Sequence, residues 1–200
     1  MSDTPSALPE KDRSQQRRDQ VLEAAAACFR RKGFHGCSMA QLAKEAGMSV
    51  GHIYHYFANK EAIIDDFIKR DLDDTLQAIG ELYESPNIFE DMVGCLREPV
   101  DLCMNLPSAA LQFEILAEAT RNPKVEAMVC EAHLRVRDAV AGLIRLGSPH
   151  PATEEELIAK AELITALFDG LTFKAIRHPE INRPAMVDIL SSTLRHILNY

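Results

Sequence analysis

The sequence lacks the signatures of several common functional classes. Few runs of β-branched residues occur, and the apolar residues recur at helical rather than alternating spacing, so we predict no strand. No GxSxG, HExxH, P-loop or dinucleotide fingerprint is present, which argues against an enzyme of a class that such motifs define. A helical enzyme without a recognisable catalytic motif remains an alternative.

The cysteines also form no recognisable set. Five are present, with no CxxC pair: Cys28, Cys37, Cys95, Cys103 and Cys130. This odd number at irregular spacing indicates neither a disulfide framework nor a zinc ribbon, so we expect no metal and no cofactor. A reducing, cytoplasmic compartment fits this usage best.

No membrane or secretion segment is evident either. Residues 1–12 are polar, contain two prolines and lack an apolar core, which argues against a secretory signal and favours a flexible tail. The longest uncharged stretch, 46–59, is too short and too polar to span a bilayer. We therefore expect a soluble protein with no membrane partner.

Apolar spacing and capping residues predict an all-α chain. Helices are expected up to Gly33, from Ser38 to Gly47, from Ser49 to about Phe57 and from Asn59 to Ser85. Proline-marked breaks predict further helices at 88–104, kinked at Pro99, and at 107–121, 123–146, 154–177 and 184–199.

Two of these helices are short and separated by a tight glycine turn, at about 38–57. Ser38 with Gln41 forms a capping-box pattern, and Ser49 caps the second helix. This is the helix-turn-helix arrangement that places one helix in the major groove of DNA.

The second short helix carries an unusual outer face. Ile53 and Phe57 point inward, while Gly51, Tyr54 and His55 point outward, flanked by His52 and Tyr56. Rings and glycine suit close approach and contacts with bases and phosphates better than they suit simple solvation. The competing interpretation is that the tyrosines pack in the small core and the histidines are ordinary surface residues.

The run AGMSVGHIYHYFANKEAII, preceded by SMAQLAKEAGMS, resembles the TetR family of bacterial transcriptional regulators over about residues 15–70. The resemblance implies that Ser38, Tyr56 and Lys60 contact phosphates and that Tyr54 and His55 contact bases or adjacent backbone. Val50, Gly51 and His52 would lie at the base-reading end of the helix. Family members often carry a polar or basic residue in place of Val50 and Thr in place of His52. We predict that His52 discriminates sequence more than Val50 does.

The net charge of −8 would by itself argue against a polyanionic partner. Residues 1–60 hold nine basic and six acidic side chains, a net charge of +3, so the remaining residues carry −11. Six basic residues of the first part could face phosphates: Arg13, Arg17, Arg18, Arg30, Arg31 and Lys32. The alternative for each of them is a solvated helix surface.

The expected organisation is a tail (1–12), a helix-turn-helix DNA-binding domain (13–74) and a helical regulatory and dimerisation domain (75–200) joined by a long helix. The last two helices carry apolar stripes that we expect to pair in a homodimer: Leu157, Ala161, Ile164, Phe168, Val187, Leu190, Leu194 and Ile197. Pairing of these helices into a four-helix bundle is also what the resemblance implies. The alternative is that the stripes form the core of a single chain.

The middle helices are expected to hold a small-molecule effector between them. Candidate lining residues are Cys103, Met104, Phe113, Glu114, Met128, His133, Phe168 and Phe173. Glu118 is expected to face solvent, while Glu114 could face either solvent or the pocket. The resemblance implies that the effector changes the separation of two DNA-reading domains, with the helix after Lys60 as the lever.

The function expected is therefore a ligand-responsive regulator that binds palindromic double-stranded operator DNA as a dimer. A repressor is favoured, although the sequence leaves an activator open. A thiol redox sensor using Cys95, Cys103 or Cys130 is a further alternative.

Overall fold

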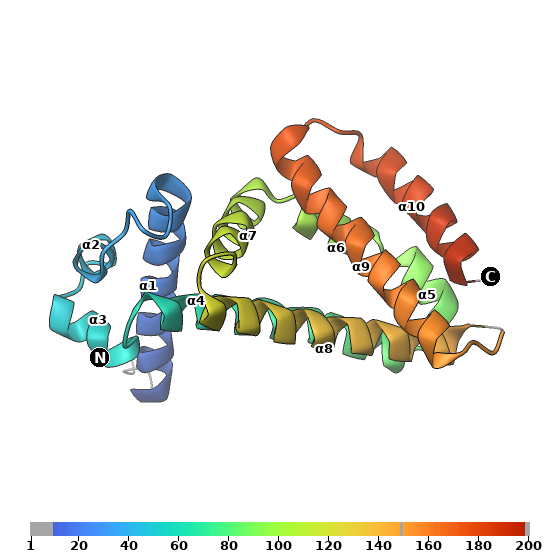
Figure 1. The fold of residues 1–200 in the computed structure, drawn as a ribbon, viewed down its shortest axis with the longest axis horizontal. Helices are drawn as coiled ribbons and strands as arrows, with labels where there is room; N and C mark the ends of the chain where they lie inside the picture. Colours follow the sequence, from blue (N-terminus) through green and yellow to red (C-terminus); the bar gives the residue numbers. More distant parts are fainter. Residues whose placement is uncertain (1–9, 149, 199–200) are drawn as a thin grey trace, which may run out of the picture. The chain divides into compact units, whose positions relative to one another are not determined.

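The computed structural model describes residues 10–148 and 150–198, and within them the chain forms ten α-helices and no strand (Figure 1). The all-α prediction is confirmed. The helices are α1 (Glu10–Lys32), α2 (Met39–Glu45), α3 (Val50–Tyr56), α4 (Lys60–Tyr83), α5 (Ile88–Gly94), α6 (Arg97–Cys103), α7 (Leu106–Ala119), α8 (Pro123–Gly147), α9 (Glu154–Arg177) and α10 (Arg183–Leu198). Of the expected tail, residues 1–9 lie outside the described residues, and α1 already includes residues 10–12.

The helices form two compact units, one up to Phe67 and one from Ile68 onward. Helix α4 begins in the first unit and continues into the second, and the boundary expected at residue 74 falls within it. Each unit has its own buried apolar side chains.

Local capping explains where the short helices of the first unit begin. The Ser38 hydroxyl accepts a hydrogen bond from the Gln41 amide at 3.2 Å, and the Gln41 side chain accepts one from the Ser38 amide at 2.9 Å. The Ser49 hydroxyl accepts from the His52 amide, and the Asn59 side chain accepts from the Ala62 amide at 2.8 Å. The three predicted caps are therefore confirmed, and each satisfies an amide that the first helical turn leaves unpaired.

Packing then fixes which side of α3 is buried and which side faces solvent. Ile53 and Phe57 are buried, together with Leu42 of α2 and Ile63 of α4. Burying one such side chain contributes about 1.5–3 kcal/mol, so turning α3 about its axis would be costly. The opposite side of α3 is consequently held toward solvent.

The second unit buries apolar side chains from α5, α6, α8, α9 and α10 in one core. The chain does not form the single kinked helix expected at 88–104: α5 ends at Gly94, and α6 begins at Arg97. Pro99 cannot donate to the carbonyl of Cys95, and its ring would clash there, so the helix stops and Pro99 lies in the first turn of the next helix.

Candidate nucleic-acid interface

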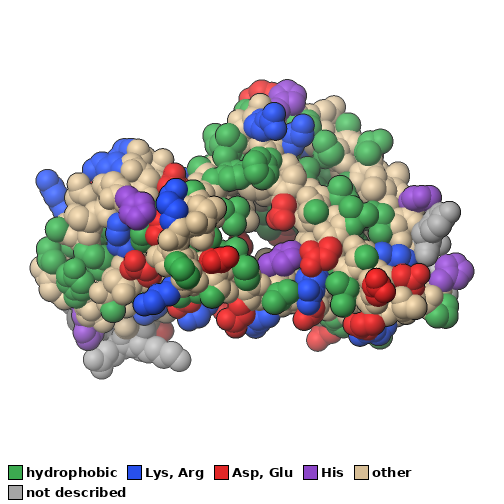
Figure 2. Space-filling view, in the orientation of Figure 1, with side chains coloured by type: hydrophobic (Ala, Val, Ile, Leu, Met, Phe, Trp, Pro, Cys, Tyr) green, Lys and Arg blue, Asp and Glu red, His purple; other side chains and the backbone are tan. Residues whose placement is uncertain are grey.

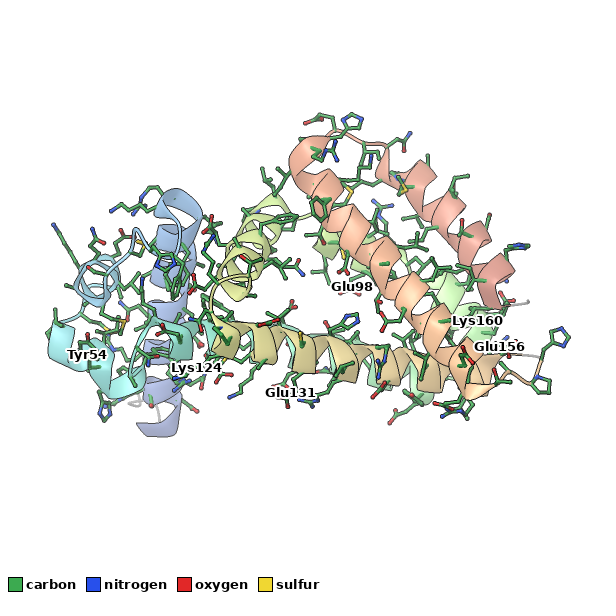
Figure 3. All side chains as sticks on the ribbon, viewed as in Figure 1. Tyr54, Glu98, Lys124, Glu131, Glu156 and Lys160 are labelled. Carbon is green, nitrogen blue, oxygen red and sulfur yellow. A yellow bond between two sulfur atoms is a disulfide. The ribbon has the colours of Figure 1, made fainter. Side chains whose placement is uncertain are left out.

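The exposed face of α3 consists of Val50, Gly51, His52, Tyr54 and His55. Val50 is 44% and Tyr54 51% exposed, which is high for large apolar or aromatic side chains. Tyr54 lies on α3 at the surface of the first unit (Figure 3). The outward direction predicted for Gly51, Tyr54 and His55 is confirmed.

The rings on α3 contact one another. The Tyr56 hydroxyl lies 3.4 Å from Nε2 of His52, and the two ring centroids are 5.2 Å apart. The ring of His55 meets that of Tyr56 edge-on at 5.1 Å. Tyr56 is half-buried, so the alternative of partial packing holds for Tyr56 but not for Tyr54. The rings therefore form one continuous contact cluster along α3.

Gly51 is not explained by the packing of the protein itself. A Cβ added at Gly51 would meet nothing within 4 Å, and its backbone is helical, where alanine is the better residue. A glycine at an open helical position is suited to close approach by another body, such as a nucleic-acid backbone.

The beginning of α2 offers a second polar contact. Ser38 is exposed, and the hydroxyl that accepts from Gln41 can still donate its own hydrogen to a phosphate oxygen. The turn between α2 and α3 is closed by Gly47, which adopts a positive φ of 63° that suits glycine.

Lys60 has a structural partner as well as its expected phosphate role. Its ammonium donates to the carbonyl of Phe34 at 2.6 Å and lies 4.1 Å from the centre of the Phe34 ring. Lys60 thereby connects α4 to the segment between α1 and α2. An ammonium has three donors, so a phosphate contact would have to share this group.

Three of the six basic residues expected to face phosphates have side-chain partners within the first unit. Arg17 donates to the side chain of Gln20 at 2.7 Å. Arg18 forms an ion pair with Asp66 at 2.5 Å, donates to the carbonyl of Tyr56 at 3.4 Å and lies over the Phe57 ring. Arg31 pairs with Glu45. Arg18 therefore fixes the end of α3 against α1 and α4, a role that the sequence interpretation missed.

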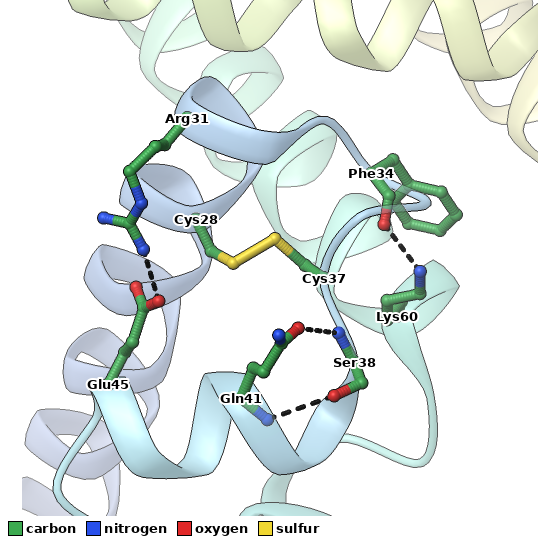
Figure 4. Close-up of a disulfide and its surroundings, with 8 residues drawn as sticks. All are labelled: Cys28, Arg31, Phe34, Cys37, Ser38, Gln41, Glu45 and Lys60. Atoms are coloured by element: carbon green, nitrogen blue, oxygen red, sulfur yellow. Dashed lines mark hydrogen bonds and ion pairs between the residues drawn. A yellow bond between two sulfur atoms is a disulfide. The ribbon is translucent and has the colours of Figure 1, made fainter.

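The first unit also contains a disulfide, so the prediction of unpaired cysteines is wrong for one pair. Cys28 of α1 and Cys37, the residue before the α2 cap, are bonded and buried (Figure 4). The two are nine residues apart, and they meet because the chain reverses direction at Gly33, which has a φ of 73°. Cys95, Cys103 and Cys130 carry free thiols.

The residues expected to line an effector pocket lie at several places in the second unit. Phe113 and Phe173 meet edge-on at 4.6 Å and line a surface pocket with Ile176 and Arg177. Met104, by contrast, is buried in the core, and Phe168 packs against that core. Met104 is thus corrected to a core residue, because the apolar environment between α6 and its neighbours encloses it.

Among the remaining pocket candidates, His133 lies between α8 and α9. His133 contacts Glu162 at 3.0 Å, and Arg137 lies 3.7 Å from the same carboxylate. Cys103 of α6 is close to Thr172 of α9, and burial raises the pKa of its thiol. Met128 and Glu114 are half-buried on α8 and α7.

This region surrounds an opening between α7, α8 and α9, which acidic side chains border in the space-filling view (Figure 2). Glu98 of α6 lies beside it (Figure 3).

Two carboxyl groups of the second unit have raised pKa values. Asp71 and Asp169 are partly exposed but have protein on several sides, and the resulting desolvation raises the pKa of both. Nearby Asp74 raises the pKa of Asp71 further. For Asp169, the nearby His133 lowers the pKa and the nearby Glu162 raises it.

Glu118 does not face solvent as expected. It is 3% exposed, and its carboxylate accepts a hydrogen bond from the side chain of Asn122 at 3.1 Å. Asn122 lies one turn further on and caps the start of α8, so the pair ties the end of α7 to the beginning of α8.

Two family descriptions match the chain. Residues 21–67 match "Bacterial regulatory proteins, tetR family", and residues 95–199, more than half of the chain, match "BetI-type transcriptional repressor, C-terminal". The chain belongs to the TetR family.

Similar proteins agree with membership of the TetR family. The HTH-type transcriptional regulator UidR of Escherichia coli is 33% identical over 132 residues, which span 66% of this chain and 66% of UidR. GusR of Salmonella enterica has the same fold, with a TM-score of 0.76, 24% identity and coverage of 92% of this chain and 95% of GusR. FadR of Bacillus subtilis, solved in complex with stearoyl-CoA, aligns with a TM-score of 0.73 and 20% identity over 88% of this chain and 96% of FadR. The family and its neighbours are transcriptional regulators rather than enzymes.

The expected dimer residues of this TetR-family chain are largely core residues. Five of them are buried within one protomer and cannot meet a partner: Leu157, Ala161, Ile164, Leu190 and Leu194. Phe168, Val187 and Ile197 are partly buried against the same core. The alternative of a single-chain core is therefore correct for these five, because the inner stripes of α9 and α10 face α5, α6 and α8.

A different stripe of α9 is exposed. Leu163, Ala166, Gly170 and Phe173 follow helical spacing on its outer side, and Leu163 and Phe173 are 50% and 52% exposed. Ile189 of α10 is 66% exposed. A Cβ at Gly170 would meet nothing within 4 Å, so the protomer leaves space for another helix there.

Two further observations concern membrane-spanning helices and metal-binding groups. In the residues that the structure describes, no helix is both long and apolar enough to cross a membrane. Nor do those residues bring three or more His, Cys, Asp or Glu side chains together in a metal-binding group.

Proposed function

We propose that this TetR-family regulator is a repressor that binds a twofold-symmetric operator as a homodimer and is released by a small molecule. The observation that carries the proposal is the exposed face of α3, where clustered rings surround a glycine that the protein's own packing does not require. In this proposal Val50, Gly51 and His52 read bases, and Tyr54 and His55 contact bases or adjacent backbone. Ser38, Tyr56 and Lys60 bind phosphates.

Dimerisation is proposed through the outer stripe of α9, with Ile189 of α10 beside it. Exposed aliphatic and aromatic side chains next to an open glycine allow two helices to pack closely. One reading helix of seven residues offers few base contacts, so two copies on a symmetric site provide the affinity that a single copy lacks.

The proposed effector site is the opening between α7, α8 and α9, with His133, Glu114 and the neighbouring carboxylates as polar contacts and Phe113 as an apolar one. A bound molecule can shift the equilibrium only by as much as it prefers one arrangement of the two reading units. Helix α4 is the proposed lever, because it begins at Lys60 and continues into the effector unit. The repressor role is supported by the description of the matched C-terminal family.

Selection of bound duplexes from a random-sequence pool by the full chain tests the proposal. We expect enrichment of an inverted repeat whose half-sites lie about one helical turn apart. Enrichment of a single unsymmetrical site would contradict the dimer, and no enrichment would contradict sequence reading by α3. For release, spin labels on α2 of both protomers should report a changed separation when an effector displaces DNA.

A further inference from the structure

The disulfide of the first unit joins α1 to the residue that precedes α2, next to a proposed phosphate contact. Cys37 is bonded to Cys28 and directly precedes Ser38, which caps α2 and is a proposed phosphate contact (Figure 4). We propose that Cys28 and Cys37 form a reversible thiol–disulfide site and that the disulfide form of the protein binds DNA more tightly than the dithiol form. The effect on DNA binding rests on the proposed function, whereas the effect on the first unit does not.

The segment between α1 and α2 connects this pair to two proposed phosphate contacts. Phe34 packs on Phe29 of α1 with ring centroids 5.4 Å apart, and its carbonyl accepts from Lys60 at 2.6 Å. Its backbone then leads through Cys37 to Ser38. The position of this segment therefore sets both the start of α2 and the acceptor that holds Lys60.

Without the covalent bond, the segment depends on weaker restraints. The Cys37 amide donates to the Phe34 carbonyl at a long 3.4 Å, and the neighbouring His35 and Gly36 are exposed. Opening the bond returns conformational freedom to residues 33–37, and DNA binding would then have to order them again. A pre-ordered segment binds more tightly because this ordering cost is already met.

The other three cysteines are less suited to this chemistry. None of them is bonded to another cysteine, whereas Cys28 and Cys37 already lie within bonding distance of each other. The free thiols are Cys95 on the segment after α5, Cys103 on α6 and Cys130 on α8. All three belong to the second unit, away in sequence from the reading helices.

The oxidant proposed is a peroxide, and the reductant is a dithiol. One thiol loses its proton, and the thiolate attacks a peroxide oxygen. The O–O bond breaks to give a sulfenic acid and hydroxide, and the hydroxide takes up that proton as one water. The second thiol attacks that sulfur, the S–O bond breaks, and its proton leaves with the oxygen as a second water. Two thiols and one hydrogen peroxide thus give one disulfide and two waters. A dithiol reverses this by two exchange steps through a mixed disulfide.

The test uses the full chain prepared with hydrogen peroxide or with dithiothreitol, and alkylation followed by mass measurement counts the free thiols. Affinity for the duplex selected as above is then measured in both forms. We expect about a tenfold loss on reduction, restored by reoxidation. The Cys28→Ser/Cys37→Ser variant should bind as the reduced form in both buffers. The matched control, Cys95→Ser/Cys103→Ser/Cys130→Ser, should keep the full response.

If the two wild-type forms differ by two free thiols but bind the duplex with equal affinity, the proposed control of DNA binding by the disulfide is wrong. A response that disappears in the control triple variant would do the same. Amide exchange of residues 33–41, measured without DNA, separates this result from a failure of the proposed function. We expect faster exchange in the dithiol form, and unchanged exchange would overturn the proposal whether or not any duplex is selected.

Discussion

The two compact units of this TetR-family chain expose different chemistry on their helices. In the first unit, the seven-residue helix α3 presents rings and a glycine. In the second, the 24-residue helix α9 presents an aliphatic and aromatic stripe on one side and contributes to the core with the other. A polar, ring-rich face suits a hydrated polyanion, whereas an apolar face suits another protein surface. The comparison thus supports the proposal that the first unit contacts DNA and the second mediates self-association.

Charge separates the units in the same way. The first unit, residues 1–67, holds nine basic and nine acidic side chains and is neutral, whereas residues 68–200 hold 13 basic and 21 acidic ones, a net charge of −8. Acidic side chains are prominent over α8 and α9 in Figure 2. Negative charge away from the reading helices disfavours non-specific contact of the second unit with DNA.

The largest expected effect comes from the proposed dimer surface. Leu163→Glu combined with Ile189→Glu should dissociate the dimer, because two charges would be buried against apolar partners. Loss of the second reading helix should reduce operator affinity about 100-fold or more. Sedimentation and duplex binding check this. Leu146→Glu, at a similarly exposed leucine of α8, is the matched control and should leave both unchanged. A variant that remains dimeric would move the interface elsewhere.

His52→Ala should have the next largest effect on DNA binding. Loss of a base contact is expected to cost about 1–3 kcal/mol on the selected duplex and little on a scrambled one. His150→Ala, in the second unit, serves as the control and should have no effect. An equal loss on both duplexes would show that His52 contributes affinity without discrimination.

The Gly51→Ala variant should weaken DNA binding without lowering the stability of the protein. Alanine is preferred over glycine in a helix by about 1 kcal/mol, and the site is open, so the melting temperature should stay the same or rise. Operator affinity should nevertheless fall about tenfold, because the methyl group obstructs the nucleic-acid backbone. Gly80→Ala, at an equally open site of α4, should stabilise in the same way without loss of affinity. Unchanged affinity for Gly51→Ala would contradict close approach at this position.

Lys60→Ala tests which of two roles this lysine has. If it contacts a phosphate, affinity on all duplexes should weaken and the salt dependence should flatten by about one unit. Loss of its contact with Phe34 should also lower the melting temperature by a few degrees. A lower melting temperature with an unchanged salt slope would leave only the structural role.

The smallest expected effect concerns the carboxylates around the opening in the second unit. The pKa of Asp71 is raised in the folded state, so its charged form destabilises the fold above that pKa. Asp71→Asn should therefore raise the melting temperature by about 1–3 °C at pH 7, and the gain should vanish below the unfolded pKa of about 4. Asp73→Asn, on the opposite side of α4, is the control. A gain that persists at pH 3 would show that charge is not the cause.

Local signals made the first unit predictable from sequence. Ser38, Ser49 and Asn59 each cap a helix within three residues of themselves, so their hydrogen bonds depend on nearby sequence alone. The inward direction of Ile53 and Phe57 follows from helical spacing. The Cys28–Cys37 bond was missed because its formation depends on the path of the segment between the helices rather than on cysteine spacing.

The second unit was less predictable because its helices carry apolar residues on more than one side. Spacing alone placed Leu157 of α9 at a dimer interface, and only tertiary packing shows that Leu157 faces the core while Leu163 is exposed. Glu118 was expected outside because carboxylates seldom lie buried, yet Asn122 provides a hydrogen bond that favours its burial.

Hydrogen–deuterium exchange of the full chain, with and without the selected duplex, tests the central claim most directly. Reading by α3 predicts protection of the amides at 38–41 and 49–56 on DNA binding. Protection confined to the second unit, with unchanged exchange in α3, would contradict it.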